Sequence, residues 1–239
     1  MHGYLWGYGY SANLSYILFV LPALILSLFA QWKVKRAYSK MSRMSSSRGY
    51  SGLTAANRVL QYYGVTGVGF AQIKGELTDN FDPRTNLINL SDGVYGSSSL
   101  AAIGIACHEA GHAAQHAEGY MPIKIRNMLL PVCRIGSVAG VPLAVIGYFV
   151  GFEPLVLVGL VLYSAIMLFQ LATLPVELNA SRRALKCIEE TGVVSSEEEL
   201  KAVKSVLTAA ALTYVASLAV SFGNLLRLII MFTGNRRKR

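Results

Sequence analysis

Long uncharged apolar stretches dominate the pattern of hydrophobic and polar positions along the chain. The first runs from Leu14 to Trp32, the second from Ile135 to Phe152 and the third from Pro154 to Val176. As a helix, the 23 residues of the third stretch would rise about 1.5 Å each and exceed the roughly 30 Å hydrocarbon thickness of a bilayer. The three stretches are therefore predicted to span a membrane.

A fourth stretch, from Ser205 to Leu226, is also uncharged, but it is rich in Ala, Ser and Thr and is followed at once by Arg227. Its weaker hydrophobicity is compatible with a span, with a helix lying in the membrane interface, and with a helix that packs against the other spans. The pattern thus predicts three to four transmembrane helices.

A hydrophilic segment, residues 33–134, follows the first span and is long enough for a small folded domain against the membrane. It opens with a Ser-rich, basic linker from Ser42 to Ser51. A short amphipathic helix from Leu53 to Tyr63 is expected next, and Gly64 is suited to end it.

Two short strands are expected after this helix, from Val68 to Ile73 and from Thr85 to Ser91, because both segments partly alternate apolar and polar residues. Residues 82–84, Asp-Pro-Arg, are typical of a turn between them. The second strand is expected to be a sheet edge, either an ordinary one or one along which a substrate peptide aligns by strand addition.

The residues from Leu100 to Glu118 have a helical pattern, with Ser98 or Ser99 available as N-cap and Gly119 at the end. Beyond this helix, a short connection at 151–154 joins the second and third spans into a hairpin that crosses the membrane and returns.

Composition changes the picture in one respect, because apolar residues make up 53% of the chain and charged residues only 15%, against about 25% in ordinary globular proteins. Much of the surface must therefore face lipid. The net charge of +9 does not indicate a nucleic-acid partner, because the basic residues lie beside the apolar stretches. The three cysteines lack a close-pair spacing and are expected to be reduced thiols, with Cys107 in the core.

Six basic residues and no acidic one follow the first span: Lys33, Lys35, Arg36, Lys40, Arg43 and Arg48. The positive-inside rule places residues 33–134 in the cytoplasm. Because the hairpin crosses the membrane twice, residues 177–204 are expected on the same face.

Three of the four histidines fall within nine residues, at positions 108, 112 and 116. His108 and His112 are separated by about 400° of helical rotation, so their imidazoles project from nearly one face and can bind one ion. Neutral imidazole suits zinc, which in catalytic sites takes three protein ligands and a water whose pKa falls to about 7. The sequence His-Glu-Ala-Gly-His at 108–112 thus predicts a zinc site with Glu109 as general base.

The third ligand has three candidates: His116, Glu118 and Glu177. An unbroken helix carries His116 about 80° and 12 Å past the ion, and Glu118 still farther. The metzincin arrangement, with a third His six residues after the second, is absent. Glu177 is favoured, because it follows the third span and so lies on the same side of the membrane as the histidine motif. It could instead form an ion pair with Arg182 or Arg183.

Ser181 lies one helical turn beyond Glu177, and its hydroxyl could accept the remaining N–H of a ligating imidazole. Tyr214 could assist the oxyanion of a reaction, but a tyrosine in an apolar helix more often packs or anchors at the interface.

The chain resembles the YugP-like family of bacterial membrane zinc metallopeptidases. The resemblance is carried by residues 81–85, Leu90-Ser91 with Val94-Tyr95, residues 99–102, the motif at 108–112 with His116, residues 125–127, and residues 174–177 with Ala180-Ser181. The order of parts is also similar to the HtpX-like and CAAX prenyl proteases, which place an Asp where this chain has Ser181. The resemblance implies peptidase activity, a zinc cofactor and a bacterial membrane.

We therefore expect an α-helical membrane protein with a small α+β, zincin-like metallopeptidase domain on the cytoplasmic face, acting as a zinc-dependent endopeptidase on protein or peptide substrates. The expected parts are an anchor at 1–32, a metallopeptidase segment at 33–134, a transmembrane hairpin at 135–176, a cytoplasmic segment at 177–204 that completes the zinc site, and an apolar helix with a basic tail at 205–239. The alternatives are a membrane metal-binding or transport protein, which leaves Glu109 without a role, and a scaffold with an inactive site.

Overall fold

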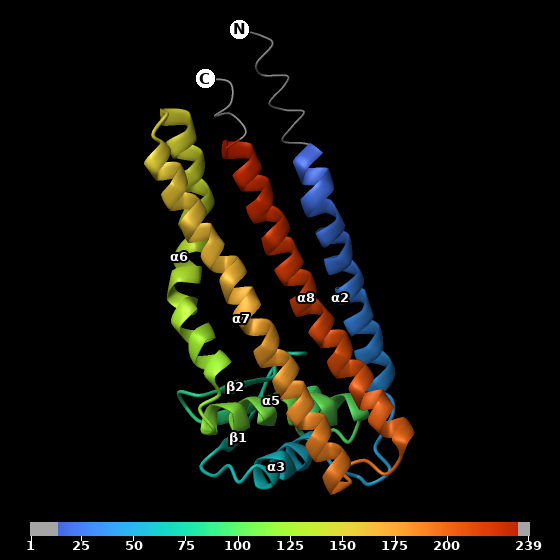
Figure 1. Ribbon diagram of the computed structural model, residues 1–239. Coiled ribbons are helices and arrows are strands. Elements are labelled where there is room, and N and C mark those ends of the chain that lie inside the picture. The colour runs from blue at the N-terminus through green and yellow to red at the C-terminus, as the bar shows by residue number, and fades with distance from the viewer. Residues whose placement is uncertain (1–13, 234–239) are drawn as a thin grey trace. The chain divides into compact units, whose positions relative to one another are not determined.

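The computed structural model describes residues 14–233, and most of them are helical (Figure 1). A short π-helical turn, Tyr16–Val20, leads into α2 (Leu21–Met41). The other elements follow in chain order: α3 (Gly52–Tyr62), β1 (Gly69–Ile73), β2 (Asn80–Asp82), β3 (Leu87–Ser91), α4 (Asp92–Tyr95), α5 (Leu100–Ala117), α6 (Met121–Val150), α7 (Glu153–Thr191) and α8 (Glu197–Thr233).

Within the described residues, four helices are long and apolar enough to cross a membrane: Tyr16–Met41, α6, α7 and Glu197–Phe232. Three of them correspond to the predicted spans, apart from two residues at the start of the first span and two at the end of the second. The fourth stretch, whose role the sequence left open, forms part of a helix that also meets these criteria. Each is longer than a bilayer requires, from 26 to 39 residues, because the helix continues from its apolar stretch into a charged one.

The described chain forms two compact units, and all four long helices are divided between them. The first, called here the membrane unit, contains the residues up to Ala30, Lys124–Leu174 and the residues from Thr213 onward. The second, called the site unit, contains Gln31–Ile123 and Pro175–Leu212.

Within the membrane unit, glycines let α6 and α7 approach each other closely. A Cβ atom on Gly140 would lie 3.1 Å from the backbone nitrogen of Tyr163, and one on Gly159 would lie 2.5 Å from that of Ala144. Small residues at such contacts are typical of helix packing in membranes, where close backbone approach replaces the hydrophobic effect as the source of association.

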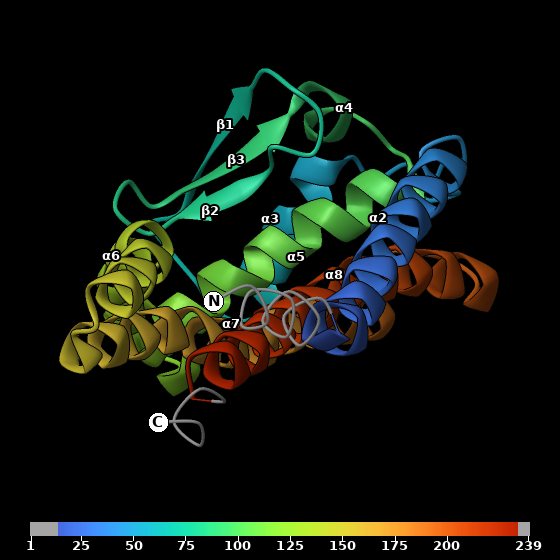
Figure 2. The ribbon, with the colours of Figure 1, turned by 90° about the horizontal axis from the view of Figure 1, so that it is seen from above.

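Within the site unit, a mixed three-stranded sheet has the order β1-β3-β2 (Figure 2). β1 pairs in parallel with β3, and β2 pairs with it antiparallel. The two predicted strands correspond to β1 and β3, whereas β2 takes in the start of the predicted turn and was missed. The expectation that Thr85–Ser91 is a sheet edge is wrong, because its strand is the central one and β2 lies beyond it.

Helix α5 packs against α3, and β2 lies alongside it (Figure 2). The hydroxyl of Ser99 accepts the N–H of Ala102 at 3.2 Å and caps the helix, and Gly119 follows its end with a φ of +66°. Both ends agree with the prediction. The buried face is dominated by small side chains and also includes Cys107, as expected.

The site unit also contains the second part of α7, which continues without a break from Pro175 to Thr191. Its buried residues recur with helical spacing: Val176, Ala180, Ala184, Cys187 and Ile188. One face of this part therefore packs in the core, and Glu177 lies within a helix rather than just after one.

Candidate metal centre

Three side chains that could bind a metal converge in the site unit, two from α5 and one from α7. The Nε2 atoms of His108 and His112 lie 3.2 Å and 3.4 Å from Oε2 of Glu177. One potential ligand atom of each residue lies within 4.8 Å of the other two. The three residues expected as ligands could therefore hold one metal ion.

A glycine inside the motif allows this convergence. A Cβ atom on Gly111 would lie 2.6 Å from the carbonyl oxygen of Ala180, a distance that a side chain cannot occupy. The backbones of α5 and α7 consequently approach each other at this point, one residue before His112 and one turn after Glu177. Any larger residue at 111 would push α7 away from the two imidazoles.

The Nδ1 atom of His108 contacts Ser181, the partner that the sequence predicted. Ser181 Oγ lies 3.0 Å from His108 Nδ1. When Nδ1–H donates to this hydroxyl, the lone pair of Nε2 faces Glu177 and is available to a metal.

The Nδ1 atom of His112 contacts Gln115, a partner that was not predicted from the sequence. Gln115 is fully buried, and its Oε1 lies 3.0 Å from His112 Nδ1. The Nε2 of Gln115 donates to the carbonyl oxygen of Val176 at 2.8 Å and to Asn179 Oδ1 at 2.9 Å. Because a carbonyl oxygen can only accept, the amide orientation is fixed, and Oε1 must accept from His112. The sequence did offer one sign of this partner, since Gln115 is a polar residue three positions after His112 in an alanine-rich helix.

The hydrogen bonds continue from Asn179 to Arg183, which also binds Glu118, one of the candidates for the third ligand. Arg183 Nε donates to Asn179 Oδ1 at 2.8 Å, and its two terminal nitrogens each lie 2.6 Å from an oxygen of Glu118. Glu118 is thus engaged away from the metal-binding group. The described ion pairs join Arg183 to Glu118 and include none with Arg182. They therefore do not support the alternative in which either arginine is the partner of Glu177.

His116 lies on the same helix, but the described metal-binding group does not include it. Its ring centroid is 5.8 Å from that of Phe81 in β2. The uninterrupted helix α5 explains the difference, because it rotates this residue away from the face that carries His108 and His112.

Glu109 faces the edge strand β2. Its Oε2 accepts the backbone N–H of Phe81 at 3.0 Å. Burial raises the pKa of its carboxyl group above the ordinary value, and the charges of His112 and His108 oppose this rise. A carboxylate with a raised pKa beside two imidazoles is suited to proton transfer near neutral pH.

The electrostatics of His112 show how the imidazoles and carboxylates compensate each other. Burial by itself would lower the pKa of His112, but its hydrogen bond to Glu177 and the charge of Glu109 outweigh that effect and raise it. The two carboxylates therefore favour positive charge at this place, as a site for a divalent cation requires.

The donor set fits zinc. Two imidazole nitrogens and one carboxylate are the ligands of many catalytic zinc sites, and hydrogen bonds at both Nδ1 atoms leave both Nε2 atoms directed at the same point.

Tyr214 belongs to the membrane unit, and its role in stabilising an oxyanion stays a prediction.

Comparisons with known proteins agree with this chemistry. A family model described as "Putative neutral zinc metallopeptidase" matches residues 16–233. The chain is 41% identical over 221 residues to "Putative membrane protease YugP" of Bacillus subtilis (strain 168), a match that covers 92% of this chain and 98% of that protein. No solved structure matches the chain. The chain belongs to the neutral zinc metallopeptidase family, and zinc is its cofactor.

Proposed function

We propose that this protein is a membrane-embedded, zinc-dependent endopeptidase in which His108, His112 and Glu177 bind zinc and Glu109 is the general base. The convergence of two Nε2 atoms and one carboxylate within 4.8 Å carries the proposal. When bound there, zinc would polarise the scissile carbonyl and make a water acidic near neutral pH.

Glu109 performs the proton transfers of the proposed reaction. Its Oε2 is held by the N–H of Phe81, which fixes the carboxylate plane and leaves Oε1 to take a proton from the attacking water. The oxygen of that water adds to the carbonyl carbon of the peptide, the C–N bond breaks, and Glu109 returns the proton to the leaving amine nitrogen.

Ser181 and Gln115 position the two imidazoles in this proposal. By accepting the Nδ1–H groups of His108 and His112, they keep each ring in the tautomer whose Nε2 can bind a metal. Such partners commonly contribute 10- to 100-fold to metal affinity.

The proposed location of the site is the cytoplasmic face of a bacterial cell membrane. Six basic residues between Lys33 and Arg48 favour this orientation by the positive-inside rule. The cytoplasmic parts would be residues 33–134 and 177–204. The lipid would hold the anchor, of which residues 14–32 are described, residues 135–176 and the apolar helix that begins the segment 205–239. The substrates would be proteins or peptides that reach this face.

The direct test of the reaction is Glu109→Gln in detergent-purified protein, assayed on casein and on a quenched peptide library with and without a zinc chelator. We expect the wild type to show chelator-sensitive cleavage and the variant to lose about 10²- to 10⁴-fold in rate while it retains zinc. Glu118→Gln is the matched control, because this carboxylate follows the same helix but bonds Arg183, and it should cleave normally.

Two results would contradict the proposal. Near-normal cleavage by Glu109→Gln would remove Glu109 as the base. A wild type that retains zinc without any chelator-sensitive cleavage would favour the metal-binding or transport alternative.

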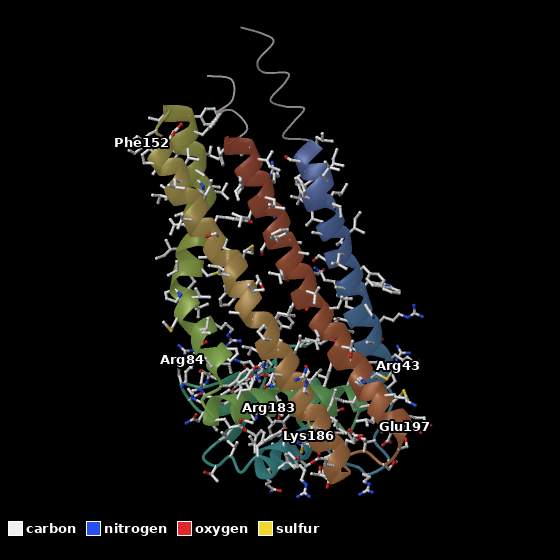
Figure 3. The ribbon with its side chains drawn as sticks, in the orientation of Figure 1. Arg43, Arg84, Phe152, Arg183, Lys186 and Glu197 are labelled. Atoms are coloured by element: carbon white, nitrogen blue, oxygen red, sulfur yellow. The ribbon has the colours of Figure 1, made fainter. Side chains whose placement is uncertain are left out.

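Orientation can be tested with cysteines at exposed positions and a membrane-impermeant thiol reagent on intact cells. Ser42→Cys and Glu198→Cys should both be protected, whereas Phe152→Cys, in the connection between α6 and α7 (Figure 3), should be labelled. Labelling of either of the first two above the wild-type background would contradict the cytoplasmic assignment.

A further inference from the structure

A cleft of about 520 Å³ opens in the site unit between residues 178–189 of α7 and residues 204–211 of α8. The two helix segments run in opposite directions, because only residues 192–196 connect α7 to α8 (Figure 1). None of the residues that could hold the metal lines this cleft. The cleft therefore adjoins the metal-binding group through Ser181, the partner of His108, but contains none of its three residues.

One end of the cleft is apolar. Leu178 lines it two residues after Val176, where the third uncharged stretch ends, and Ala211 lines it from inside the fourth stretch. Both helices thus lead from this end of the cleft into segments that are long and apolar enough to lie in a bilayer.

Basic side chains line the rest of the cleft, together with the apolar Leu185 and Leu207. Arg182, Lys186 and Lys204 line it together with one anion, Glu189, so the lining carries an excess of two positive charges. Lys186, on the lower part of α7 in Figure 3, lies 4.0 Å from the exposed Glu190. Within residues 14–233, neither Arg182 nor Lys204 forms an ion pair. Two cations of the lining are therefore not ion-paired within the described residues, although Glu189 also lines the cleft.

We propose that this cleft binds one anionic phospholipid, with its phosphate among Arg182, Lys186 and Lys204 and the start of an acyl chain along Leu178 and Ala211. Basic pockets next to membrane helices are suited to anionic headgroups. A free phosphate or an acidic peptide would use the cations but would leave the apolar end uncovered. The volume lies within the roughly 300–1,000 Å³ typical of small-molecule sites and suits a headgroup with part of a chain.

Ser181 also lines the cleft, and its hydroxyl lies 3.0 Å from His108 Nδ1. The bound lipid would thus lie beside a residue that supports the metal centre. The cations of the cleft are separate from the metal-binding residues, so lipid binding and zinc retention can be measured independently in the same variants.

The test is native mass spectrometry of delipidated protein in detergent, titrated with phosphatidylglycerol and, separately, with phosphatidylcholine. We expect one phosphatidylglycerol molecule to bind at least tenfold more tightly than phosphatidylcholine. A double variant, Arg182→Gln with Lys204→Gln, should bind phosphatidylglycerol about 25-fold more weakly, because each cation near a lipid surface contributes a factor of about five. Zinc content should be unchanged, which also shows that the variant is folded.

Lys201→Gln is the matched control, because Lys201 lies on the same helix, is well exposed and does not line the cleft. It should bind phosphatidylglycerol like the wild type. Equal binding of the two lipids, or an equal loss in Lys201→Gln, would overturn the proposal. Competition by inorganic phosphate or by an acidic peptide at the affinity of the lipid would also overturn it, since it would identify a soluble ligand.

Discussion

The two parts of α7 have the same secondary structure but opposite packing. In the membrane unit several large apolar side chains of α7 are exposed, and Leu157 and Val161 are 63% and 60% exposed. In the site unit, from Pro175 onward, Ala184 and Ile188 are fully buried, and the polar side chains contact other parts of the protein. One part of α7 is thus suited to lipid and the other to water.

This difference follows from what each solvent demands of a side chain. Lipid is as apolar as leucine, so apolar residues facing it need no protein partner, and small residues at helix contacts provide the packing. Water drives apolar residues inward at about 25 cal/mol per Å². The site-unit part of α7 therefore has a core face, and only there can Glu177 and Ser181 be held against α5.

Ile188→Ala and Leu157→Ala test the comparison most strongly. The first should reduce the free energy of unfolding by about 2–5 kcal/mol, because it empties a buried core position. The second should change it by about 0.5 kcal/mol or less, because its side chain faces outward. Thermal and denaturant unfolding in detergent would measure both, and similar losses would show that the two parts of α7 pack alike.

Ser181→Ala and Ser164→Ala compare two serines on the two parts of α7. Ser181 supports His108, so its loss should weaken zinc affinity about 10- to 100-fold. Ser164 donates only to the carbonyl oxygen of Val161 in its own helix, so its loss should leave zinc affinity unchanged. Competition with a chromophoric chelator gives both affinities, and equal values in the two variants would exclude Ser181 as a positioning residue.

Glu118→Gln should have a small effect on stability. Hydrogen bonds from Arg183 lower the pKa of Glu118 below its ordinary value, so the pair stabilises the fold above the ordinary carboxyl pKa of about 4.3 and loses this contribution as the pH falls through the lowered pKa. Because Glu118 is about half exposed, we expect less than about 1 kcal/mol at pH 7. The unfolding of zinc-free wild type and variant should converge once the pH lies below the lowered pKa of Glu118, and a difference that persists in acid would contradict the pairing.

Much of the helical architecture could be predicted from the sequence, because uncharged stretches long enough for a bilayer depend on composition alone. The ends of α5 were also predictable, since Ser99 and Gly119 act through local backbone geometry. β2 could not be predicted in this way. It has three residues, and its pairing with β3 is a tertiary contact with no pattern of its own.

The candidate site was predictable where helical geometry decides the question. The spacing of His108 and His112 follows from rotation along α5, and the topology of the hairpin brought Glu177 into consideration. The support of His112 was missed, because Gln115 is fixed by Val176 and Asn179 of a distant segment. Such a partner becomes visible only when α5 and α7 are seen together.

The most direct test of the metal centre is the zinc content of purified Glu177→Ala and His116→Ala, measured by elemental analysis after dialysis against a weak chelator. We expect Glu177→Ala to lose zinc and activity together, because it removes one of three converging donors. His116→Ala should retain about one zinc per chain, because His116 lies against Phe81 outside the group. Zinc lost from His116→Ala and retained by Glu177→Ala would contradict this assignment and indicate a site of three histidines.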